Sequence, residues 1–161
     1  MEGSMILRLI LSIIVFFNLL FSTMSKAEQA QVLTTIDGVE ISLHDLKGKN
    51  PVYILFFEPY SQVGVLDAQI IQQQYGDQLE VIGISPIMNS NESVLKWVRD
   101  SLGVTYSMVL DKDYSLSRRF GAWSHPTQII INKEGVVVYG SDENTPSVEL
   151  VKREIAELLG L

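Results

Sequence analysis

Apolar and polar positions along the chain follow a pattern that predicts strands and helices in turn. The run 52–57 is almost entirely apolar and rich in β-branched and aromatic residues, as expected of a central strand buried on both faces. A similar run over 79–85 predicts a second buried strand. Between them, a helix capped by Ser61 and ending near Gly76 is predicted from apolar residues at three- and four-residue spacing: Val63, Leu66, Ile70 and Ile71.

The rest of the chain continues this alternation and ends in two strands and a helix. Near the start, β-prone runs flank Asp37-Gly38, a turn signal that predicts an N-terminal hairpin. The later predicted elements are a helix that starts at Asn89 to Glu92, spaced as a capping box, and stops at Gly103, a strand over 106–110, a helix over 114–120, strands over 127–131 and 136–139, and a last helix ending at Gly160. This order predicts an α/β fold with a mixed central sheet, helices on both faces and an N-terminal β-hairpin.

The N-terminal segment differs in composition from the rest. Arg8 precedes an apolar run of the length found in secretory signal peptides, and Ser25 and Ala27 supply small residues where signal peptidase reads them. The sequence thus predicts a signal peptide over 1–27 and a mature domain over 28–161, in the periplasm or another extracytoplasmic compartment. An uncleaved membrane anchor is the alternative, although a spanning helix needs about 20 apolar residues.

Charge and cysteine content exclude several functional classes. The chain has 161 residues and a net charge of −7, and its only adjacent basic pair, Arg118-Arg119, is typical of a solvated helix face. An acidic protein without clustered basic residues is not expected to bind nucleic acid. No glycine-rich phosphate loop is present, so no nucleotide cofactor is predicted. The sequence contains no cysteine, which excludes disulfides, thiolate chemistry and lipid attachment to cysteine.

Four segments share their order and spacing with a known family. They are 37–49, 52–57, 82–85 with 109–111, and 125–135, and they span nearly all of the mature chain. Together they resemble the thioredoxin superfamily, in particular the TlpA/ResA type and the related AhpC/TSA redoxins. The resemblance implies a thioredoxin-like fold.

The resemblance also locates a degenerate active-site motif. The positions of the family's Cys-x-x-Cys pair here hold Ser61, Gln62, Val63 and Gly64. In the family the first sulfur lies at a helix start, where the helix dipole stabilises a thiolate. A serine hydroxyl has no comparable acidity and cannot form a disulfide. Neither thiol–disulfide exchange nor peroxidase activity is therefore expected, and no catalytic residue is assigned.

A cis-proline loop, formed by His125, Pro126 and Thr127, is the second site feature that the resemblance implies. In the family this proline faces the redox motif and leaves main-chain groups free to pair with an extended partner segment. The alternative is a proline that merely starts a strand. We expect the rim of the intervening groove to be formed by Glu58, Tyr60 and Trp123.

Other chemistries are less well supported by the residues present. A Ser61–His125 pair would suggest a hydrolase, but the sequence identifies neither an orienting acid nor oxyanion donors. Two histidines and scattered methionines are too few to predict a metal site.

Two hypotheses of function follow. The first is a non-catalytic binding or accessory protein that holds an extended segment of another exported protein in the groove. The second is an enzyme of a non-thiol kind using the same groove, and a diverged relative without a ligand is a further possibility.

Overall fold

The computed structural model describes residues 32–141 and 147–161, so the signal peptide predicted over 1–27 lies outside the described residues. In chain order the elements are β1 (Val32–Thr34), β2 (Glu40–Ser42), α2 (Leu43–Leu46), β3 (Val52–Phe56), α3 (Val65–Tyr75), β4 (Glu80–Pro86), α4 (Glu92–Leu102), β5 (Ser107–Asp111), α5 (Ser115–Phe120), β6 (Thr127–Ile131), β7 (Val137–Ser141) and α6 (Val148–Leu159). None of the described helices is long and apolar enough to cross a membrane.

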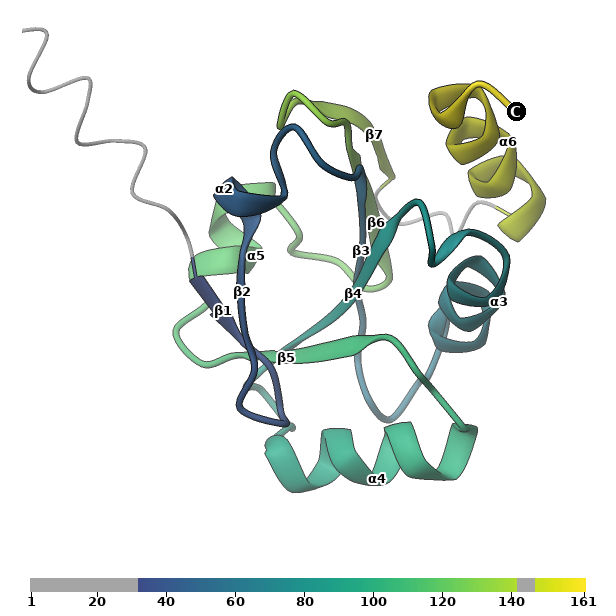
Figure 1. Cartoon of the computed structure of the whole chain (residues 1–161). Helices are drawn as coiled ribbons and strands as arrows, with labels where there is room; N and C mark the ends of the chain where they lie inside the picture. The colour runs from purple at the N-terminus through teal and green to yellow at the C-terminus, as the bar shows by residue number, and fades with distance from the viewer. Residues whose placement is uncertain (1–31, 142–146) are drawn as a thin grey trace, which may run out of the picture. The chain divides into compact units, whose positions relative to one another are not determined.

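A five-stranded mixed sheet forms the centre of the domain. Its strand order is β5-β4-β3-β6-β7, with β3 and β4 parallel and β6 antiparallel to β3 (Figure 1). Strands β1 and β2 form a separate antiparallel hairpin in which Thr34 pairs with Glu40, around the predicted turn at Asp37-Gly38. The mixed sheet and the N-terminal hairpin confirm the fold predicted from the sequence.

Two apolar layers cover the sheet, and the central strand contributes to both. Alternate side chains of a strand point to opposite faces, which explains why the run from β3 into Phe57 is apolar throughout. One face packs against α3, α4 and α6 through Tyr53, Leu55 and Phe57. The other packs against β1, α2 and α5 through Val52, Ile54 and Phe56.

The strand pairing brings three loops to one edge of the sheet. Phe56, at the end of β3, pairs with Ile84 of β4 on one side and with Thr127, the first residue of β6, on the other. The chain after β3, the chain after β4 and the chain before β6 therefore leave the sheet at the same edge. We call the loops 57–64, 87–91 and 121–126 together the site edge.

Helix α3 differs from the sequence prediction in its start and in its buried face. It begins at Val65 with Gly64 as N-cap, so Ser61 is not the cap. Its buried side chains are Val65, Ala68, Gln69, Ile71 and Tyr75, whereas Val63, Leu66 and Ile70 are exposed. Of the four apolar positions predicted to face the core, Ile71 is buried, whereas the prediction is wrong for the other three.

Candidate functional site

The degenerate motif is a turn and not the first turn of a helix. The main-chain oxygen of Glu58 accepts hydrogen bonds from Ser61 N (3.2 Å), Gln62 N (3.1 Å) and Ser61 Oγ (3.1 Å). Gln62 and Gly64 have φ angles of 53° and 81°, in the left-handed region. A helix cannot pass through these two residues, because left-handed backbone interrupts right-handed helical geometry.

Gly64 brings the degenerate motif against the cis-proline loop. A Cβ atom built on Gly64 would lie 3.0 Å from Leu55 Cδ1 and 3.8 Å from Pro126 Cβ. The His125–Pro126 peptide bond is cis, the conformation expected from the resemblance. Thr127 starts β6, is buried, and donates its hydroxyl to the main-chain oxygen of Ser124 (2.7 Å). The two predicted site features are therefore adjacent.

Glu58 and His125 face each other across the site edge. His125 Nδ1 lies 3.9 Å from Glu58 Oε1, beyond hydrogen-bond distance, and the side chains are 10% and 49% exposed. Within the described residues, His125 Nε2 is buried without a hydrogen-bond partner. Burial lowers the pKa of His125 below its usual 6.5, and the nearby Glu58 carboxylate opposes this effect. The imidazole is therefore neutral at neutral pH.

Aromatic and aliphatic side chains are exposed along the site edge. Tyr60 is 74% exposed and Trp123 is 66% exposed. Ile87 and Met88 of loop 87–91 are also exposed at the site edge, and they were not predicted as site residues from the sequence. Both residues directly follow a buried strand. This position could have indicated that they belong to the site, because the ends of parallel strands lie at the same edge of a sheet.

The geometry does not support a hydrolase. Ser61 Oγ donates to the main-chain oxygen of Glu58, and no hydrogen bond joins Ser61 to His125 in the described part of the chain. A serine nucleophile needs a base within hydrogen-bond reach. Nor do three or more histidine or carboxylate side chains gather into a metal-binding group anywhere in residues 32–141 and 147–161. The site edge is thus an apolar contact surface with one carboxylate, that of Glu58.

We predict that restoring the cysteine pair strains the turn. In Gly64→Cys the side chain must adopt a left-handed backbone, at about 1–2 kcal/mol, and it meets Leu55. Ser61→Cys changes an exposed turn position and should be nearly neutral. Urea unfolding under reducing conditions should therefore show the double variant less stable than Ser61→Cys alone. Gly103→Cys, at a left-handed glycine facing open space, measures the backbone part of the cost. Equal stability of Ser61→Cys and the double variant would contradict the observed turn.

We also predict a pH-dependent contribution of His125 to stability. Because the folded pKa is lowered, both states are neutral above about 6.5 and the full contribution is present there. As the pH falls below 6.5, the unfolded chain binds a proton more readily than the folded chain. The stabilising contribution therefore decreases, and the decrease ends once the pH is below the folded pKa. The wild type should therefore lose more stability on acidification than His125→Gln, in urea titrations at a series of pH values. His44→Gln, at the exposed histidine of α2, should follow the wild type. Parallel curves for wild type and His125→Gln would refute the prediction.

Comparison with known proteins agrees with this geometry. Residues 24–140 match the profile of the AhpC/TSA family. The thiol-disulfide oxidoreductase ResA of Halalkalibacterium halodurans is 31% identical over 131 residues, which cover 76% of this chain and 73% of that protein.

Solved structures share the fold. A secreted disulfide oxidoreductase of Mycobacterium tuberculosis superposes with a TM-score of 0.69 at 14% identity, over 80% of this chain and 96% of that one. The exposed lipoprotein thioredoxin Etrx1 of Streptococcus pneumoniae gives a TM-score of 0.63 at 24% identity, over 80% and 99%. The chain is thus a cysteine-less protein with a thioredoxin-like fold, and it belongs to the AhpC/TSA family.

Proposed function

We propose that this protein is an exported, non-catalytic binding protein that holds an extended segment of another exported protein against its cis-proline loop. The proposal rests on the main-chain groups of His125. Within the described residues the main-chain N–H and C=O of His125 form no hydrogen bond, and neither do the Trp123 C=O and the Ser124 N–H, whereas the Trp123 N–H donates to Gly121 and the Ser124 C=O accepts from the Thr127 hydroxyl. Free main-chain groups beside a strand are what an added extended segment pairs with.

The exposed side chains around His125 support the same function. Trp123 lies two residues before His125, and Tyr60 lies in loop 57–64, which Gly64 brings close to Pro126. Large exposed apolar side chains gathered at one place are typical of a protein-binding surface. Aromatic side chains also contribute much of the binding energy in such surfaces. Main-chain pairing and apolar contacts together suit a peptide segment better than a small polar substrate.

The proposed function is also consistent with the absence of the family's thiol chemistry from this chain. With no cysteine in the chain, a bound segment cannot form a mixed disulfide with it. Binding is then reversible and depends on contacts alone. The protein would shield or position the segment without changing its covalent structure.

We predict that truncating the two rim aromatics weakens binding. The probe is a short, fluorescein-labelled peptide of alternating valine and threonine, measured by fluorescence polarisation. Loss of a central aromatic contact typically costs 1–3 kcal/mol or more, so Tyr60→Ser and Trp123→Ser should each weaken binding by about tenfold. Trp97→Ser is the matched control, because Trp97 is 60% exposed but lies on α4, outside the site edge.

Two outcomes of this experiment contradict the proposal. One is a wild-type protein that binds no extended peptide. The other is equal loss of affinity in the Trp97 and Trp123 variants, which would assign binding to exposed aromatics in general.

Export is the second part of the proposal, and it rests on residues 1–27. Related structures described as secreted and as an exposed lipoprotein support it. We expect protein recovered from the extracytoplasmic fraction to have the intact mass of a chain that starts at Glu28. A full-length soluble species confined to the cytosol would refute export, and a full-length membrane-bound species would indicate the uncleaved anchor.

A further inference from the structure

The segment that carries two of the three site-edge loops has charges of one sign. Between Pro51 and Leu95 the chain contains no lysine or arginine, and its charged side chains there are Glu58, Asp67, Asp77, Glu80 and Glu92. Within the three loops of the site edge, Glu58 is the only carboxylate and there is no lysine or arginine. The apolar surface of Tyr60 and Trp123 therefore has a single carboxylate beside it.

Among residues 32–141 and 147–161, Glu58 forms no ion pair with a lysine or arginine. Its one recorded side-chain contact is His125 Nδ1 at 3.9 Å. Burial keeps that imidazole neutral, as its lowered pKa indicates. The Glu58 side chain is half-exposed, so a group arriving from solvent can reach it. A carboxylate in this setting attracts a cation more strongly than one in open water, because the apolar neighbours reduce the local dielectric.

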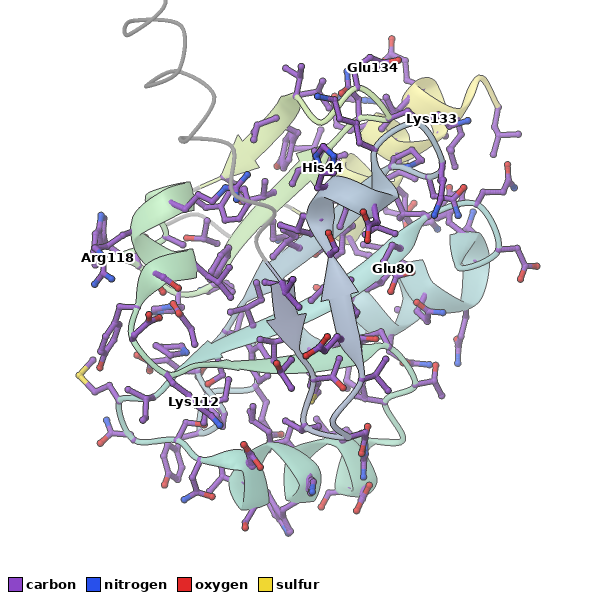
Figure 2. All side chains as sticks on the ribbon, turned by 60° about the vertical axis from the view of Figure 1, so that its left-hand side comes forward. His44, Glu80, Lys112, Arg118, Lys133 and Glu134 are labelled. Carbon is purple, nitrogen blue, oxygen red and sulfur yellow. The ribbon has the colours of Figure 1, made fainter. Side chains whose placement is uncertain are left out.

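Three basic side chains of the neighbouring elements contact other groups or point away from the sheet. Lys112, after β5, pairs with Glu92 at 2.8 Å. The guanidinium of Arg119 lies 5.5 Å from the centre of the Phe120 ring. Arg118 projects from α5 away from the sheet (Figure 2). The described residues therefore leave the charge of Glu58 to be met by a ligand.

We infer that the segment held at the cis-proline loop carries a lysine or arginine that pairs with Glu58, between apolar side chains that cover Tyr60 and Trp123. This inference rests on the proposed function and specifies its partner as an extended, apolar segment with a positive charge. Main-chain pairing at His125 places a side chain of the segment beside Glu58, because His125 and Glu58 face each other.

Three peptides test the inference. Each alternates valine and threonine, and the central residue is lysine, glutamine or glutamate. A half-exposed ion pair contributes up to about 1 kcal/mol, so the lysine peptide should bind about three- to fivefold more tightly than the glutamine peptide. The glutamate peptide should bind most weakly, and high salt should reduce these differences.

Variants at Glu58 separate the charge effect from general binding. In Glu58→Gln the lysine and glutamine peptides should bind equally, and in Glu58→Lys the preference should reverse in favour of glutamate. Glu134→Gln is the matched control, because Glu134 is an exposed carboxylate in the turn between β6 and β7, at the other end of β6 (Figure 2). It should keep the preference for lysine.

The outcomes distinguish the two proposals. Equal binding of all three peptides, with loss in Trp123→Ser, would overturn the cationic preference and leave the proposed function in place. Absence of binding to every peptide would overturn the proposed function itself. A concentration-dependent dimer that excludes the peptides would assign the surface to a second copy of the chain and would also overturn the inference.

Discussion

Strand β3 pairs on both sides, in parallel with β4 and antiparallel with β6, and this pairing determines which loops meet. Phe56 lies between Ile84 and Thr127, so the degenerate motif after β3 and the cis-proline loop before β6 must leave the sheet together. Gly64 then fits within van der Waals distance of both Leu55 and Pro126. The arrangement of the site loops thus follows from the strand pairing, and it is present although the chain has no cysteine.

The degenerate motif does not lie at a helix start. In the turn over 61–64 two residues have positive φ angles, and α3 starts only at Val65. The helix N-terminus, which could stabilise a negative charge, is therefore at Val65 and not at Ser61. Substituting sulfur for oxygen at Ser61 would not by itself recreate a stabilised thiolate. The proposed binding surface, by contrast, consists of Tyr60, Trp123 and the main chain of His125, and it does not require a helix start at Ser61.

Much of the fold could be predicted from the sequence, and less of the site. The apolar run of β3, the hairpin at Asp37-Gly38 and the order of the elements were sufficient for the fold, because each is a local pattern with one structural solution. The start of α3 was predicted wrongly, since a serine after a proline is equally compatible with a cap and with a turn. Only the three-dimensional arrangement shows that Gly64 adopts a left-handed conformation against Leu55.

The charge environment of the site could not be predicted either. Glu58 was expected at the rim, but the 3.9 Å approach of His125 and the burial of its Nε2 depend on how two distant loops meet. The exposure of Leu66 and Ile70 likewise depends on which side of α3 faces the sheet. Such features follow from packing between segments, which the periodicity of one segment does not encode.

Binding of an extended segment at the site edge, as proposed above, can be tested directly. The measurement is a titration of the isotopically labelled protein with the lysine-centred peptide, followed by two-dimensional NMR of the amide and indole N–H groups. Saturable shifts are expected at the His125 amide, the Trp123 indole and the loop around Tyr60, with β7 and α6 unaffected. Shifts confined to β7 or α6, or no saturable shift at all, would contradict the proposed binding.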